Sequence, residues 1–176
     1  MPPQHTDGRF ADQTFAADEL LFRRVPISHV EDGELSLLAI SNGLKFEKNP
    51  PNCSSVVRGK YCTHFSDALH PDCADDKECP DTTVYFLRVG DLAKGMMIMP
   101  PEKALARIWD LYPYHDPLPK CYAHSTICSC EQSRPNVPVK PPQSVRDQFR
   151  EWLWENLQSC ELLESPPTVE ADCRIR

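Results

Sequence analysis

Eighteen of the 176 residues are proline, and this feature restricts the fold more than any other. The share is about twice the usual one of roughly 5%. Proline has no backbone N–H and interrupts both helix interiors and central strands. The composition therefore predicts a chain built mainly from short strands and loops rather than from long helices.

Runs of β-branched and aromatic residues, bounded by Gly, Pro and Asn, indicate strands between these breaks. The expected strands are Glu19–Pro26, Glu34–Ser41, Ser54–Cys62, Thr82–Gly90, a short run in "KGMMIMP" (94–100) and Tyr122–Cys130. The "EDG" turn (31–33) suggests that the first two strands form a hairpin. The run over Thr82–Gly90 is the strongest strand signal in the chain.

Two segments have apolar residues at helical spacing. The segment Glu102–Tyr112 follows Pro101 and places Ala104, Leu105, Ile108 and Leu111 on one side. The segment 144–158 places Val145, Phe149, Trp152, Leu153 and Leu157 on one face, with Ser144 and Asp147 in a capping arrangement. The fold class expected is α+β, with a mainly antiparallel sheet of five or six strands and two packed helices.

The sequence also predicts how the chain is divided and which partners it excludes. Residues 1–17 are predicted to be a flexible arm, residues 18–160 a single domain and residues 161–176 a disordered tail. A formal net charge of -7 argues against sequence-independent binding to duplex DNA, which needs clustered Lys and Arg. No window approaches the roughly 18 apolar residues that a membrane span needs. The N-terminal residues lack the pattern of a secretory signal, so we expect a cytoplasmic protein without membrane partners.

Nine cysteines raise the question of metal. In a reducing compartment they are expected to be thiols or metal ligands rather than disulfides. "HPDC" (His70, Cys73) and "CYAH" (Cys121, His124) would together make a Cys2His2 zinc site. The alternative is that the cysteines are small buried hydrophobes. Strand alternation favours that alternative, because it places Cys121 and His124 on opposite faces of the strand. Zinc stays open as the one candidate cofactor.

A second set of residues is cationic. "FRR" contributes Arg23 and Arg24, and "SSVVRGK" contributes Ser55 and Arg58. If their strands neighbour the late strand, an arginine could meet Arg58 and His124 in a site for a phosphate or carboxylate. The alternative is that these arginines are ion-paired with the abundant Asp and Glu.

Other catalytic patterns are weaker. "HSTI" (His124–Ile127) has the form of one box of the two-histidine phosphoesterases, but the best second box, "HFSD" (His64–Asp67), ends in Asp instead of an apolar residue. The sequence has no P-loop, G-x-G-x-x-G, H-E-x-x-H or G-x-S-x-G pattern.

The order of "LFRRVP", "DGELSLLAIS", "SSVVRGKY" and "YAHSTI" resembles a set of small bacterial proteins of unknown function. These share a strand with paired Arg, a G-x-L-S-x-x-A strand, an S-V-x-R strand and a late A-H-S strand. The matching positions here are Arg23, Arg24, Ser36, Ala39, Ser55, Arg58, His124 and Ser125. The resemblance implies no activity, but it adds Ser36 to the Arg, Ser and His residues already selected.

The leading hypothesis is therefore an anion or nucleotide-phosphate pocket that binds a phosphate-bearing small molecule. It would be lined by Arg23, Arg24, Ser36, Ser55 and Arg58. Whether the protein is an enzyme stays open. If it is, His124 is the expected general acid or base, and the arginines stabilise developing negative charge. The rival hypothesis is a non-enzymatic component of a multi-protein bacterial system. It would bind a protein partner through the acidic loop His70–Asp81 and the C-terminal helix, with an exposed Trp154.

Overall fold

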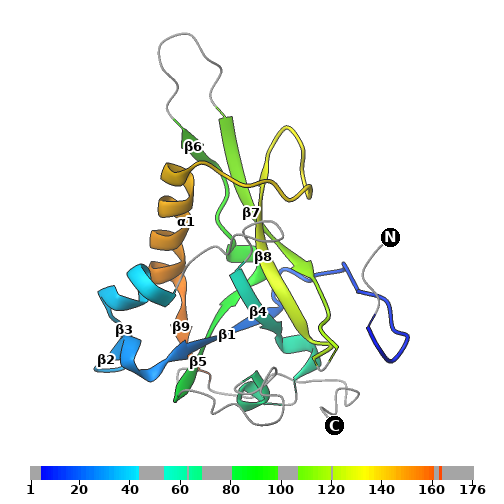
Figure 1. Cartoon of the computed structure of the whole chain (residues 1–176), viewed down its shortest axis with the longest axis vertical. Coiled ribbons are helices and arrows are strands. Elements are labelled where there is room, and N and C mark those ends of the chain that lie inside the picture. The colour runs from blue at the N-terminus through cyan, green and yellow to red at the C-terminus, as the bar shows by residue number, and fades with distance from the viewer. Residues whose placement is uncertain are drawn as a thin grey trace.

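The computed structural model describes residues 5–43, 54–62, 64–68, 81–98, 107–119, 121–160 and 163. Its centre is a seven-stranded antiparallel sheet in the order β6-β7-β8-β4-β1-β5-β9, with one α-helix along it (Figure 1). The strands are β1 (Leu20–Pro26), β4 (Ser54–Arg58), β5 (Thr82–Arg88), β6 (Met96–Ile98), β7 (Arg107–His115), β8 (His124–Glu131) and β9 (Gln158–Ser159). A separate ribbon pairs β2 (Val30–Glu31) with β3 (Glu34–Leu35). The helix α1 spans Gln143–Asn156.

The expected α+β class and antiparallel sheet are confirmed: six strands have three or more residues, and the two-residue β9 extends one edge. The second packed helix is not found in the described part of the chain. Residues 107–112 of the segment predicted to be helical lie in β7, and residues 102–106 lie outside the described residues. The apolar spacing over 102–112 wrongly predicted a helix, because Trp109 and Leu111, both fully buried, also satisfy the two-residue period of a strand.

The predicted hairpin between the first two strands is also wrong. The "EDG" turn joins β2 to β3, with φ of 50° at Asp32 and 83° at Gly33, which is the backbone that a two-residue hairpin turn requires. The segment predicted as a strand over Glu34–Ser41 leaves the ribbon after Leu35 and forms a π-helical turn, η2 (Ala39–Gly43). Leu35 and Ala39 are buried at helical spacing, whereas Leu37 is 71% exposed.

The helix α1 confirms the prediction for its segment. Val145, Phe149 and Leu153 are fully buried against one face of the sheet. Its N-terminus differs in detail, because the cap is Pro142 and no side chain caps it. Asp147 instead accepts a hydrogen bond from the Gln143 side chain at 2.7 Å.

Each face of the sheet carries its own apolar cluster. The face under α1 holds the larger one, which includes Leu21, Val56, Leu111 and Ile127. The opposite face holds Phe22, Val57, Phe86 and Cys121, among others. Because neighbouring residues on one strand point to different faces, they have different surroundings, and this decides which polar side chains can meet.

Candidate functional site

The strand order brings a serine and a histidine together on the face of the sheet opposite α1. β4 lies between β1 and β8, as the anion-site hypothesis required. In the β4–β8 register, Ser55 is opposite Thr126 and Val57 is opposite His124, so Ser55 and His124 are diagonal neighbours on one face. The Ser55 Oγ lies 2.8 Å from His124 Nε2, which is hydrogen-bonding distance.

The other ring nitrogen of His124 determines how this hydrogen bond runs. His124 Nδ1 lies 2.6 Å from the backbone carbonyl oxygen of Asp116. A carbonyl oxygen only accepts, so Nδ1 carries the hydrogen. In the neutral ring Nε2 then has a free lone pair, and the Ser55 hydroxyl donates to it. The three groups form a relay from the Ser55 hydroxyl through the imidazole to the Asp116 carbonyl.

Accessibility differs across this relay. Ser55 is exposed, whereas His124 is only 7% exposed. The hydroxyl can therefore meet a molecule from solvent, while the histidine stays fixed behind it. This combination of an accessible nucleophile, a base within reach and a third group that orients the base is the arrangement of nucleophilic catalysis.

Two arginines from β1 border the serine. β1 and β4 pair only at Leu21–Arg58 and Phe22–Val57. Beyond this point Arg23 Nη1 bridges the two strands, donating to Ser54 Oγ at 2.5 Å and to the Ser55 carbonyl oxygen at 2.8 Å. Alternation along β1 places Arg24 on the Phe22 face, which is also the Ser55 face. The cationic side chain on the Ser55 face is therefore Arg24, while Arg23 holds the Ser55 main chain from the other face.

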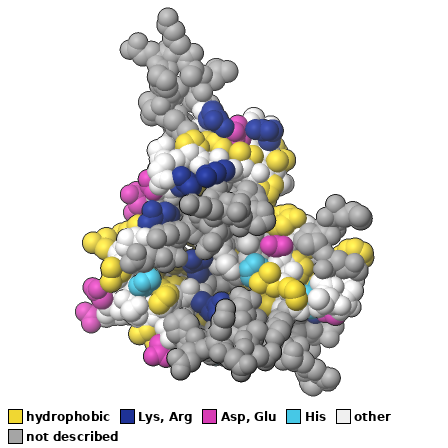
Figure 2. All heavy atoms as spheres, in the orientation of Figure 1, with side chains coloured by type: hydrophobic (Ala, Val, Ile, Leu, Met, Phe, Trp, Pro, Cys, Tyr) yellow, Lys and Arg dark blue, Asp and Glu magenta, His cyan; other side chains and the backbone are white. Residues whose placement is uncertain are grey.

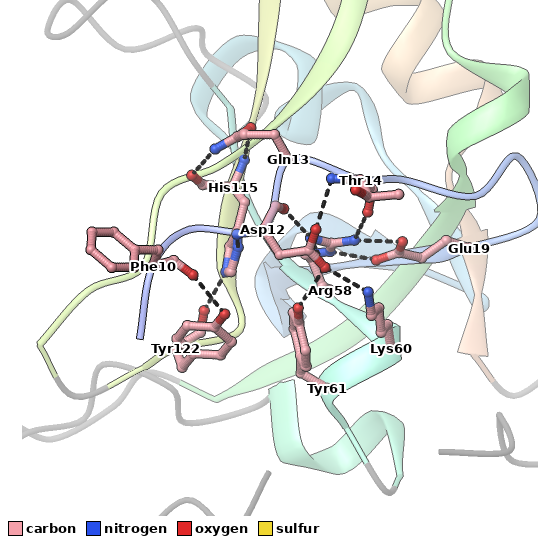
Figure 3. A network of polar contacts seen from close by, with 10 residues as sticks. All are labelled: Phe10, Asp12, Gln13, Thr14, Glu19, Arg58, Lys60, Tyr61, His115 and Tyr122. Atoms are coloured by element: carbon pink, nitrogen blue, oxygen red, sulfur yellow. Dashed lines mark hydrogen bonds and ion pairs between the residues drawn. The ribbon is translucent and has the colours of Figure 1, made fainter. Parts of the chain in front are cut away.

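Arg58 takes no part in this arrangement. It follows Val57 on β4, so its side chain points to the opposite face from His124. The guanidinium is fully buried and binds Glu19 through two hydrogen bonds, Nε to Oε1 at 2.5 Å and Nη2 to Oε2 at 2.7 Å (Figure 3). It also donates to the carbonyl oxygens of Asp12 and Thr14 at 2.6 and 2.5 Å. Arg58 is thus an internal anchor for the N-terminal segment.

That segment is held in place from residue 5, although the sequence suggested a flexible arm over residues 1–17. Asp12 is its centre: the carboxylate Oδ2 accepts from Lys60 Nζ at 2.6 Å and from the Tyr61 hydroxyl at 2.9 Å. Burial raises the pKa of Asp12, but these hydrogen bonds, with one from the Thr14 backbone, bring the pKa well below its ordinary value. Burial, together with the hydrogen bond to Asp12, raises the pKa of Tyr61.

The remaining predicted site residues lie apart from the relay. Ser36 is 8% exposed and lies between β3 and η2, where its backbone N–H donates to the His29 carbonyl oxygen. His64 is exposed beside η4 (Phe65–Ala68). Trp154, on which the rival hypothesis depended, is half-buried and donates from Nε1 to the Leu35 carbonyl oxygen at 2.8 Å. The acidic loop of that hypothesis, His70–Asp81, lies outside the described residues except for Asp81.

The proposed metal ligands are only partly described. Cys121 is buried in the cluster around Phe22 and forms no disulfide, and both ring nitrogens of His124 lie within hydrogen-bonding distance of oxygen atoms. His70 and Cys73 lie outside the described residues. Within the described ranges, no three His, Cys, Asp or Glu side chains are grouped to hold a metal.

The cysteines differ in state. Four of the described cysteines are thiols outside any disulfide, as the sequence suggested: Cys62, Cys121, Cys130 and Cys160. Cys128, in contrast, is disulfide-bonded. Burial raises the pKa of the Cys160 thiol to about 12 and also raises the pKa of Cys130. A thiol with a raised pKa is a poor nucleophile at neutral pH, so these two buried cysteines are not candidates for catalysis.

Sequence reasoning missed the acceptor of the relay. The Asp116 group that orients His124 is a backbone carbonyl, and no side-chain pattern indicates it. Sequence reasoning also missed His115, which precedes Asp116 in the chain and is fully buried.

Figure 2 views the molecule as in Figure 1 and shows His, Lys or Arg, and hydrophobic side chains close together near its centre. Among the helices described, none has the length and apolar character to cross a membrane. Comparison with family models, with curated proteins and with solved structures gave no match.

Proposed function

We propose that the protein catalyses hydrolysis or transfer at an ester, with a phosphate ester as the favoured substrate. Ser55 is the nucleophile and His124 the general base. The observation that carries this proposal is the 2.8 Å approach of Ser55 Oγ to His124 Nε2, with His124 Nδ1 held at 2.6 Å by the Asp116 carbonyl.

The residues account for each proton in such a reaction. As Ser55 Oγ forms its bond to the phosphorus or carbonyl carbon, its proton passes to His124 Nε2. The imidazolium then donates that proton to the departing oxygen as the ester bond breaks. Water, activated by the neutral histidine, releases the group from Ser55, and the proton taken from water returns to the serine oxygen.

Arg24 on β1 supports a substrate that carries negative charge. Strand alternation puts its side chain on the same face of the sheet as the Ser55 hydroxyl, whereas Arg23 holds the Ser55 carbonyl oxygen from the other face. A fixed positive charge stabilises a phosphoryl group and the extra negative charge that develops as Ser55 attacks. This supports a phosphate-bearing small molecule over a neutral ester.

Hydrolysis of p-nitrophenyl phosphate and p-nitrophenyl acetate tests the proposal. We expect Ser55→Ala to reduce kcat to background, and His124→Gln to reduce it by about 100-fold or more, the usual scale for loss of a general base. Ser133→Ala is the matched control, because Ser133 is an exposed serine whose hydroxyl donates to Glu131. A Ser55→Ala protein as active as the Ser133→Ala control would refute the proposal. The ratio of the two wild-type rates distinguishes phosphoryl from acyl transfer.

A further inference from the structure

We infer that the N-terminal segment completes the site, with Gln13 as a positioning residue that acts on His124 through the backbone at residues 115–116. This inference rests on the proposed function, since it concerns the same Ser55–His124 pair. In this inference Gln13 acts on the pair through the peptide unit between His115 and Asp116.

The first contact is between the Gln13 amide and the main chain of His115. Gln13 Nε2 donates to the His115 carbonyl oxygen at 2.8 Å, and the His115 N–H donates to Gln13 Oε1 at 3.2 Å. β6 pairs with β7 at residues 107–109, and among the described strands none pairs with this edge of β7 at His115. The side-chain amide fills this edge and pairs with both polar groups of the backbone, as a neighbouring strand would.

The second contact fixes the His115 ring. The Asp12 backbone N–H donates to His115 Nδ1 at 2.8 Å, and His115 Nε2 lies 2.6 Å from the Tyr122 carbonyl oxygen (Figure 3). Because the first partner only donates and the second only accepts, the ring is neutral with its hydrogen on Nε2. Burial lowers the pKa of His115, with a smaller opposing effect from the Tyr122 hydrogen bond. The His115 main chain is therefore held by the Gln13 side chain, and its ring by the backbone of Asp12 and Tyr122.

Asp116, the next residue, connects His115 to the imidazole of His124. The Asp116 carbonyl oxygen accepts from His124 Nδ1, and the Asp116 N–H donates to the His124 carbonyl oxygen at 3.3 Å. If Gln13 releases His115, the peptide that orients the imidazole loses its support. A catalytic base that is poorly oriented costs rate out of proportion to any structural change, since an error of about 1 Å can cost about 100-fold.

Histidine NMR on the full-length protein tests the inference directly. In the wild type we expect opposite tautomers, with the hydrogen on Nδ1 in His124 and on Nε2 in His115, read from ¹⁵N shifts and ring proton couplings. Gln13→Ala removes both hydrogen bonds to His115 and should move the His124 signals toward a mixture of tautomers. Lys60→Met is the matched control, because it removes another contact of the same arm, the one to Asp12 Oδ2, without touching His115.

A fluorophosphonate probe provides the functional half of the test. Its rate of attachment to Ser55 should fall about 10-fold or more in Gln13→Ala and stay at the wild-type value in Lys60→Met. Unchanged His124 signals in Gln13→Ala would overturn the inference, as would changed signals with an unchanged rate of labelling. If wild-type Ser55 does not react at all, the proposed function fails, and the NMR signals alone still decide whether Gln13 orients His124.

Discussion

Removing the buried guanidinium of Arg58 should destabilise the fold strongly. In Arg58→Met the methionine keeps much of the apolar stem, but the Glu19 carboxylate, with a side chain only 5% exposed, loses its cationic partner. The carbonyl oxygens of Asp12 and Thr14 lose their donor as well. Breaking a buried ion pair by removing one partner costs about 3–5 kcal/mol.

Urea denaturation measures this loss. With a slope of about 2 kcal/mol per molar urea, the midpoint should fall by roughly 1.5–2.5 M. The comparison is Lys60→Met: the Lys60 side chain is 44% exposed and pairs with Asp12 at 2.6 Å. An exposed ion pair contributes about 0.2–1 kcal/mol, so the midpoint of Lys60→Met should fall by no more than about 0.5 M.

A second variant separates loss of the charge pair from loss of packing. In the double substitution Arg58→Met with Glu19→Leu no buried charge is left unpaired, so much of the lost stability should return, because replacing both partners of a buried pair by apolar residues is often close to neutral. The reasoning is refuted if Arg58→Met costs no more than Lys60→Met. It is equally refuted if the double variant is less stable than Arg58→Met alone.

Three further results are expected. The free energy of unfolding should fall as the pH drops below about 6.5, because His115 binds a proton near that pH in the unfolded chain. The buried ring of the folded protein, whose pKa is lowered, does not bind it. His115→Gln should reduce this pH dependence in urea titrations, and an unchanged dependence would contradict the prediction. Phe149→Ala, at a fully buried position on α1, should cost about 3–5 kcal/mol by thermal or urea unfolding, whereas Glu151→Ala on the exposed side of the same helix should stay within about 0.5 kcal/mol. Trp154→Phe removes the hydrogen bond to the Leu35 carbonyl and should cost about 1 kcal/mol; a loss of binding to another protein without any loss of stability would instead favour an interaction role.

The strands that form the centre of the sheet could be predicted because their composition and turns agree. β1, β4, β5 and β8 are β-branched or aromatic runs whose neighbours break secondary structure. β7 could not be distinguished from a helix, since over six residues its apolar positions satisfy both periods. β3 was predicted too long, because only tertiary packing determines that the chain leaves the ribbon after Leu35.

The candidate site was predictable in part for the same reason. Ser55 and His124 meet because β4 and β8 pair, and that pairing was one of the conditions stated from the sequence. The spacing of Ser55 and Arg58 also held information: residues three apart on a strand lie on opposite faces, so both could not line one pocket. What the sequence could not indicate is that Glu19 and two backbone carbonyls bind Arg58, or that a backbone carbonyl orients His124, because these contacts depend on the path of the N-terminal segment.

Intact-mass spectrometry after treatment with a fluorophosphonate tests the central claim most directly, because this probe forms a covalent bond to a serine oxygen activated by a histidine. We predict a single adduct on the wild-type protein, located at Ser55 by peptide mapping. The adduct should be absent in Ser55→Ala, much slower in His124→Gln and unchanged in Ser133→Ala. A wild-type protein that gains no adduct, or an adduct that persists in Ser55→Ala, would contradict the assignment of Ser55 and His124 as a catalytic pair.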